Sequence, residues 1–151
     1  MIPRLIRRYL ALVSALKDLS PLLFRLILAF GFAGPAYLKI TNFNDTTKFF
    51  GSLGIPLPEL NAYLATATEV AGTTLILLGL ATRFAAIPMI VVMIVAIKTV
   101  HWPNGFSCGQ NGFETPLYFL IMLFSLIVTG AGRFSLDRLL EKRFDNSINK
   151  V

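Results

Sequence analysis

The sequence is dominated by four long runs of apolar residues. They span residues 21–38, 60–80, 84–100 and 116–132. The only charged residues inside them are Arg25, Glu69 and Lys98. Each run would form a helix of roughly 25–32 Å, close to the thickness of the hydrocarbon core of a bilayer. The chain is 55% hydrophobic and 15% charged, and ordinary soluble domains carry about 25% charged residues. These features predict an all-α fold in which four transmembrane helices form a bundle.

Positively charged residues are distributed unevenly between the two ends of such a bundle. Eleven of the 14 Lys and Arg residues lie in the N-terminal segment, at the start of the first run, in the tight second connection or in the C-terminal tail. The opposite end holds Lys39, Lys48 and Lys98. By the positive-inside rule, both termini are predicted to be cytoplasmic, with residues 39–59 and 101–115 facing outward. The net charge of +6 then reflects contact with anionic lipid, and no nucleic-acid partner is expected.

The N-terminal segment is predicted to be a basic amphipathic helix that lies along the cytoplasmic leaflet. Arg4, Arg7 and Arg8 share one helical face, and apolar side chains share the other. A cleaved signal peptide is the alternative, because these Arg residues precede a short apolar run. The predicted segments are an interfacial segment at 1–19, a membrane domain at 20–140 and a charged cytoplasmic tail at 141–151.

The first outward connection, residues 41–60, is predicted to contain a short interfacial helix. Asn44 or Asp45 can cap this helix, which would place aromatic side chains on one side before two glycines end it. We interpret the helix as a lid at the level of the lipid headgroups, and a substrate gate is the alternative.

The second outward connection, residues 98–116, is the most varied polar stretch of the chain. It contains the single histidine, His101, and the single cysteine, Cys108. One cysteine forms no intrachain disulfide, and the spacing of His101, Cys108 and Glu114 matches no established metal-binding pattern. No metal site is therefore expected.

Glu69 is the most informative charge in the apolar runs. It lies nine residues from Leu60, which places it about 13 Å deep in a core of about 30 Å. An unpaired charge there costs about 3 kcal/mol, so the carboxylate is expected to face the bundle interior and to have a function. Two structural explanations stay open: a protonated Glu69 bonded to Thr66, Thr73 or a neighbouring helix, or a pair that only ties two helices. Arg25 is interpreted as an anchor that snorkels to the cytoplasmic surface.

Other polar groups are predicted to gather near the outer ends of the helices. Lys39 and Lys98 end two of the runs, and His101 and Glu114 lie just beyond them. The expected arrangement is an acid near the midplane with two ammonium groups, an imidazole and a second carboxylate above it. This arrangement suits an anionic or quinone-like ligand, or a proton path. Glu69 and His101 are therefore the candidate catalytic residues, and Lys39, Lys98 and Glu114 the candidate cofactor-binding residues.

Several segments together resemble the DoxX family of small bacterial and archaeal membrane proteins. They are GPAYLKI, FFGSLGIPLPEL, TEVAGTTLILLGLATRFAAI, HWPNGF and GAGRFSLDRLL. The resemblance runs from about Leu23 to Leu140, and it implies a four-helix bundle in the cytoplasmic (inner) membrane with both termini inside. The recurring polar positions of the family correspond to Lys39, Glu69, Thr82, Arg83, His101, Asn104, Glu114 and residues 133–137. Residues 34–37 depart from the pattern, since a glycine preceded by a polar residue or histidine is common there.

Members of this family are associated with quinone-linked oxidation and with oxidoreductase complexes that handle thiol or oxidative stress. The resemblance therefore implies a quinone-proximal component of a membrane oxidoreductase system, with a non-covalent quinone and an oxidoreductase partner subunit. The sequence contains no haem-ligand pair, flavin fingerprint or dithiol, so as an enzyme the chain would be at most a subunit or accessory. In this hypothesis Arg83, and Arg133 with Asp137, fix the cytoplasmic ends of the helices.

The alternative hypothesis is a non-catalytic membrane protein, either a scaffold, a small-solute permease or an envelope-stress protein. The oligomeric state is left open by the sequence.

Overall fold

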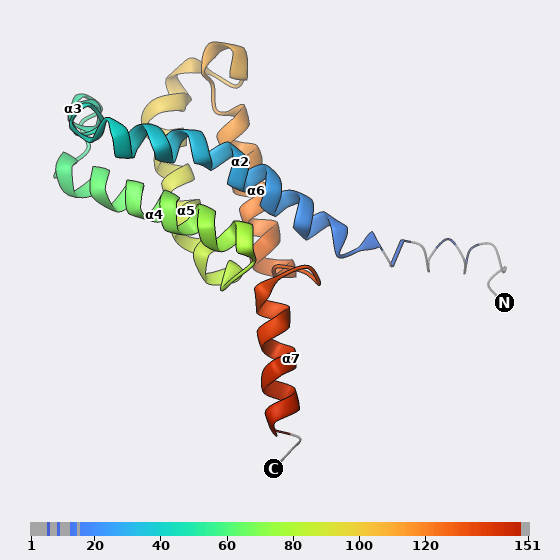
Figure 1. The fold of residues 1–151 in the computed structure, drawn as a ribbon. Helices are drawn as coiled ribbons and strands as arrows, with labels where there is room; N and C mark the ends of the chain where they lie inside the picture. The colour runs from blue at the N-terminus through green and yellow to red at the C-terminus, as the bar shows by residue number, and fades with distance from the viewer. Residues whose placement is uncertain (1–5, 7–8, 10–12, 15, 149–151) are drawn as a thin grey trace.

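The computed structural model describes residues 6, 9, 13, 14 and 16–148, with side chains as far as residue 143. These residues form helices and their connections, with no strand among them, which confirms the all-α prediction. The α-helices are α2 (Leu19–Thr41), α3 (Phe43–Ser52), α4 (Pro58–Leu78), α5 (Thr82–Ala96), α6 (Glu114–Thr129) and α7 (Leu136–Ile148) (Figure 1). Three short turns, η1 (Ile97–His101), η2 (Trp102–Asn104) and η3 (Cys108–Gln110), lie between α5 and α6.

All four predicted apolar runs are helical, as α2, α4, α5 with η1, and α6. The continuous helical segment Thr82–Asn104 and helix α2 are long and apolar enough to cross a membrane, and α6 is a shorter apolar helix. Most of the predicted N-terminal amphipathic helix lies outside the described residues. The predicted boundary at residue 140 falls inside α7, so the described part of the charged tail continues a helix that begins in the membrane domain.

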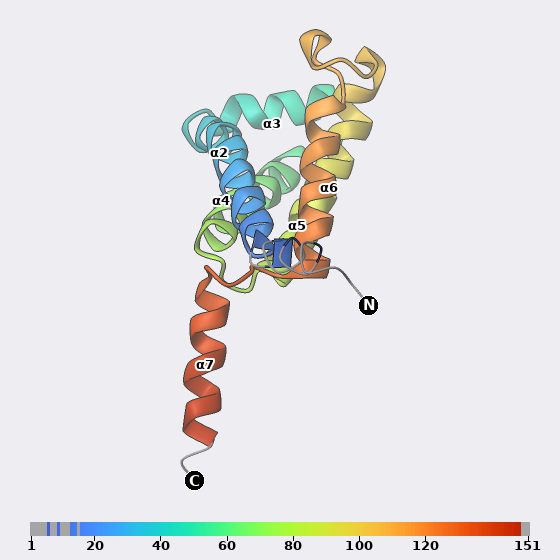
Figure 2. The same cartoon turned by 90° about the vertical axis from the view of Figure 1, so that its right-hand side faces the viewer.

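The four apolar helices pack around one core. Helix α2 packs on α4, α4 on α5, α5 on α6 and α6 back on α2. Fully buried side chains from each of them meet in this core, namely Leu28, Phe32, Ile76, Met89, Leu123 and Leu126. Helix α7 contributes no described side chain to this core and extends away from the other helices in both views (Figures 1 and 2).

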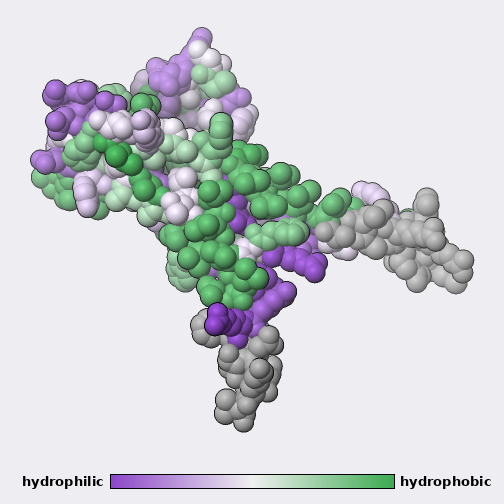
Figure 3. Space-filling view, viewed as in Figure 1, coloured by the Kyte–Doolittle hydropathy of each residue, from purple (hydrophilic) through white to green (hydrophobic). Residues whose placement is uncertain are grey.

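The surface of the bundle is strongly apolar. Phe30 and Phe84 are 88% and 77% exposed, and many other large apolar side chains of α2, α4, α5 and α6 are also exposed. Figure 3 shows these residues across the middle of the molecule, with hydrophilic residues at its two ends. We call the end formed by α3 and residues 98–114 the head, and the end formed by residues 79–83 and 130–137 the base. An apolar surface of this extent fits contact with lipid.

Helix α3 confirms the short helix predicted in the first outward connection, but not its predicted cap. It begins at Phe43, directly after Asn42, and so starts before both Asn44 and Asp45. The Asn42 side chain donates to the carbonyl oxygen of Leu38 and to Thr41 Oγ1. The prediction of an Asn44 or Asp45 cap is wrong because α3 follows α2 without a connecting loop.

The base is held together by the turn between α4 and α5. Gly79, with φ +67°, ends α4, and its N–H donates to the carbonyl oxygen of Ile76. Asp137, in the first turn of α7, donates its N–H to the Gly79 carbonyl oxygen at 2.9 Å. Its carboxylate accepts the N–H groups of Ala81 and Thr82 at 2.7 and 3.2 Å, where α5 begins. The start of α7 is thus bonded to the end of α4 and to the start of α5.

Gly79→Ala is predicted to destabilise the protein more than Gly54→Ala, although both glycines have φ near +70°. At Gly54 nothing lies within 4 Å of an added Cβ, so the cost is the left-handed backbone alone, about 1–2 kcal/mol. At Gly79 the added Cβ would lie 2.6 Å from Ser135 Cβ and 2.7 Å from the Arg25 guanidinium, which adds roughly 1–3 kcal/mol. Detergent-solubilised unfolding curves measure both costs, and equal losses would contradict this account of the base.

Candidate functional site

Lys39 and Glu69 form an ion pair between α2 and α4. Lys39 lies in the last turn of α2, and Glu69 lies in the middle of α4. The Lys39 ammonium donates to both carboxylate oxygens of Glu69, at 2.9 and 2.7 Å. The side chain of Glu69 is 3% exposed and that of Lys39 is 20% exposed. The Glu69 carboxylate is therefore buried, whereas the Lys39 ammonium reaches the surface of the helix pair.

The threonines beside Glu69 do not bond to it. Thr66 Oγ1 donates to the carbonyl oxygen of Ala62, one turn back along α4. Thr73, one turn beyond Glu69, has a buried hydroxyl without a hydrogen-bond partner. Of the two structural explanations left open by the sequence, the geometry fits the ion pair and not the threonine-bonded acid. The Thr73 hydroxyl remains available on the α4 face that carries Glu69.

His101 and Glu114 lie in the head and bond to the connection between α5 and α6. His101 Nδ1 lies 2.8 Å from the carbonyl oxygen of Asn111. The Glu114 carboxylate accepts the backbone N–H of Cys108 at 2.9 Å and the hydroxyl of Tyr118 at 3.0 Å. Glu114 lies just before the predicted span 116–132, and its pKa is below the ordinary value chiefly because the Cys108 N–H donates to the carboxylate.

Aromatic rings complete this connection. Trp102 stacks on Phe113 with ring centroids 5.2 Å apart, and Phe106 meets the same ring edge-on at 5.5 Å. Lys98, in η1, is exposed and makes no hydrogen bond or ion pair with another described residue. Of the five predicted site residues, the structure joins Lys39 to Glu69 and places the other three in or beside the head connection. Among the described residues, no group of three His, Cys, Asp or Glu side chains could hold a metal ion.

Arg25 is a second buried charge, and its interpretation as a snorkelling anchor is wrong. The residue is 3% exposed. Its guanidinium donates to the carbonyl oxygens of Ile76 and Leu77 at 2.8 and 2.6 Å, and to those of Ala131 and Phe134 at 3.1 and 2.6 Å. The last carbonyls of a helix have no partner within it and carry partial negative charge. Arg25 turns inward because these four carbonyl oxygens lie within hydrogen-bonding distance of its guanidinium.

One feature of the sequence is consistent with this role of Arg25. Arg25 lies six residues inside α2, and two segments that contain glycine, 79–83 and 130–132, come to the same end of the bundle. Such segments end helices and so leave carbonyl groups that need donors. Their meeting with Arg25 depends on packing over more than 50 residues of chain separation.

The apolar surface, the helices of membrane-spanning length and the charges sealed between them define a helical membrane protein. The sequence model of the DoxX family matches residues 20–102, more than half of the chain. The chain belongs to the DoxX family.

Three relatives illustrate the similarity. The chain is 40% identical over 105 residues, 62% of its length, to "Uncharacterized membrane protein Rv3486" of Mycobacterium tuberculosis. It is 34% identical over 122 residues, covering 80% of this chain and 86% of the relative, to "Putative oxidoreductase CatD" of Bacillus subtilis. It is 33% identical over 105 residues, 66% of this chain and 75% of the relative, to "Inner membrane protein YphA" of Escherichia coli.

The chain matches only part of the length of two relatives. The chain spans 64% of the length of the mycobacterial protein and 56% of that of a Haemophilus influenzae relative. No solved protein structure matches the chain.

Arg25→Met is predicted to lower the free energy of unfolding by roughly 3 kcal/mol or more, because it leaves buried carbonyl groups without donors. Arg25→Lys should fall between this variant and the wild type, since an ammonium keeps the charge but cannot match the planar fork of the guanidinium. Arg138→Met is the matched control, because Arg138 is exposed and pairs only with Glu141. Reversible unfolding in mixed micelles compares the three, and equal stability of Arg25→Met and Arg138→Met would contradict the assigned role.

Lys39 and Glu69 are predicted to be strongly coupled in stability. Lys39→Met leaves a buried carboxylate without its partner and should cost roughly 3 kcal/mol. Glu69→Met should cost less, because the freed ammonium is near the end of α2 and can reach the membrane surface. The double variant should be more stable than Lys39→Met alone, and a double-mutant cycle of unfolding free energies measures this coupling. Additive effects would show that the pair is not formed in the folded protein.

Proposed function

We propose that the chain crosses the cytoplasmic membrane four times, with both termini inside. Each of the four apolar runs is a helix, and the apolar surface between head and base fits lipid. The base and the segments that adjoin it carry Lys17, Arg83, Arg133, Arg138 and Lys142, whereas the head carries Lys48 and Lys98 with Lys39 below it, as the positive-inside rule requires. The names of two relatives, which place them in a membrane and in an inner membrane, support this location.

We further propose that the protein is a quinone-proximal component of a membrane oxidoreductase system. The single observation that carries this proposal is the Lys39–Glu69 pair, a charged centre held between two helices inside the apolar part of the molecule. Intramembrane ionisable residues that face the bundle interior commonly mark ligand sites or proton relays. The Bacillus subtilis relative carries the word oxidoreductase in its name, which is consistent with this class of function.

The donor set of the pair fits the oxygen atoms of a quinone headgroup. The partly exposed Lys39 ammonium can donate a hydrogen bond to a carbonyl oxygen, and the Glu69 carboxylate can accept one from a hydroxyl group. The buried Thr73 hydroxyl offers one further donor on the same face of α4. A bound quinone would supply the acceptor for two electrons and two protons, and a partner subunit would supply the electrons. Lys39 and Glu69 would orient the headgroup and hold a proton at the Glu69 carboxylate.

A structural tie in a non-catalytic protein is the second candidate, and one observation favours it. The ammonium and the carboxylate satisfy each other through two hydrogen bonds. Neither Lys39 nor Glu69 lines either of two pockets at the base of the described structure, one around residues 129–142 and one around residues 133–139. In a scaffold, permease or envelope-stress protein, the pair would only join α2 to α4.

Quinone titration of the purified protein in lipid nanodiscs separates the two candidates. Glu69→Gln and Lys39→Met should weaken quinone binding by about 10-fold or more, because each removes a charge-assisted hydrogen bond. Glu59→Gln is the matched control, since Glu59 is exposed in the first turn of the same helix. Quinone binding that is absent from the wild type, or unchanged in both site variants while their folding is intact, would exclude the quinone assignment and favour the tie.

A further inference from the structure

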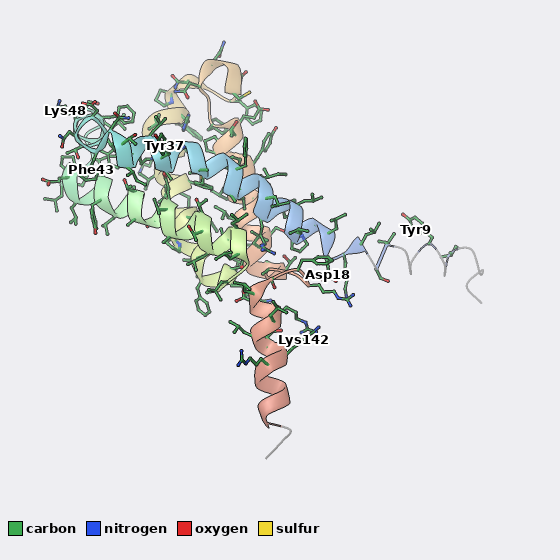
Figure 4. The ribbon with its side chains drawn as sticks, in the orientation of Figure 1. Tyr9, Asp18, Tyr37, Phe43, Lys48 and Lys142 are labelled. Carbon is green, nitrogen blue, oxygen red and sulfur yellow. The ribbon has the colours of Figure 1, made fainter. Side chains whose placement is uncertain are left out.

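An open groove of about 1210 Å³ lies at the base, away from the Lys39–Glu69 pair. Four segments line it: the residues just before α2, the start of α5, the connection between α6 and α7, and the first turns of α7. Figure 4 shows Asp18 and Lys142, which come from the first and the last of these segments, on the same side of the base. The groove therefore exists only when segments distant in the sequence fold together.

The groove is lined with cations that the protein does not neutralise. Its basic residues are Lys17, Arg83, Arg133, Arg138 and Lys142, and its acids are Asp18, Asp137 and Glu141. Asp137 caps the start of α5, and Glu141 pairs with Arg138 at 2.9 Å. The side chains of Lys17, Arg133 and Lys142 form no hydrogen bond or ion pair with any other described residue.

Exposed apolar side chains adjoin these cations. Phe84 and Leu140 line the groove itself and are 77% and 44% exposed. Phe134 and Leu139, both 61% exposed, line a smaller pocket that shares Arg133 with the groove. A free phosphate ion would gain nothing from these apolar surfaces, whereas an acyl chain beside an anionic headgroup would bury them.

We propose that this groove binds the phosphate headgroup of an anionic membrane lipid. Arg133 offers a planar guanidinium that matches two phosphate oxygens, and Lys17 and Lys142 offer ammonium groups. The acyl chains lie against the exposed side chains of Phe84 and Phe134. The site is distinct from the Lys39–Glu69 pair and does not depend on the proposed quinone chemistry.

Binding of phosphatidylglycerol to the purified full-length protein, followed by native mass spectrometry of detergent complexes, tests this site. Arg133→Gln should weaken binding about fivefold, and the double variant Arg133→Gln/Lys142→Gln about 25-fold, from roughly 1 kcal/mol per cation near an anionic lipid surface. Lys48→Gln removes one charge at the head, far from the groove (Figure 4), and should leave binding unchanged. Equal losses in Lys48→Gln and Arg133→Gln would overturn the proposal, as would unchanged binding in the double variant.

Two further ligands identify the source of the phosphate group. Phosphatidylcholine, which carries no net charge, should bind the wild type and the double variant equally. Inorganic phosphate at millimolar concentration should not displace phosphatidylglycerol, because it gains no contact with Phe84. Displacement by inorganic phosphate would overturn the lipid assignment and make a free anion the occupant. Thermal stability of each variant, which should stay within a few degrees of the wild type, shows that lost binding is not lost folding.

Discussion

A charged group surrounded by hydrocarbon must find its partner inside the protein, and the structure follows from that constraint. Arg25 and Glu69 are the two charges within the apolar helices that are buried, and both are matched at hydrogen-bonding distance. Arg25 is matched by four carbonyl oxygens and Glu69 by one ammonium group. Some threonine hydroxyls follow the same constraint by donating to the carbonyl oxygen four residues earlier, as Thr74 and Thr99 do, whereas the buried hydroxyls of Thr73 and Thr82 have no partner.

The two matched charges lie in different parts of the bundle and suit different roles. Arg25 joins the end of α4 to the connection after α6, and Asp137 joins α7 to the turn between α4 and α5. Together they fix the geometry of the base, and with it the spacing of the cations that line the groove. The Lys39–Glu69 pair joins only α2 and α4, and its ammonium is partly exposed. Because the Lys39 ammonium is accessible, it can exchange the Glu69 carboxylate for a ligand. The Arg25 guanidinium is enclosed by four carbonyl acceptors and cannot do so.

Much of the fold follows from local patterns, whereas the partners of the charges do not. The apolar runs predicted all four core helices, and the depth of Glu69 in its run predicted that its carboxylate faces the interior. The interpretation of Arg25 failed because its acceptors come from residues 76–77 and 131–134, which only the packed bundle brings to it. Of the polar groups predicted near the outer ends of the helices, only Lys39 bonds to Glu69. His101 and Glu114 bond to backbone groups of their own connection, because its turns bring Asn111 and Cys108 to them.

The central claim is that Lys39 and Glu69 stay paired inside the bilayer, and solid-state nuclear magnetic resonance tests it most directly. Among the described residues this is the one Lys–Glu ion pair. Protein labelled with ¹⁵N at lysine Nζ and ¹³C at the glutamate carboxyl carbon should therefore show one strong dipolar coupling in lipid bilayers, as expected for hydrogen bonds of 2.7–2.9 Å. The coupling should disappear in Lys39→Met. A bilayer sample of the wild type without this coupling would contradict the account.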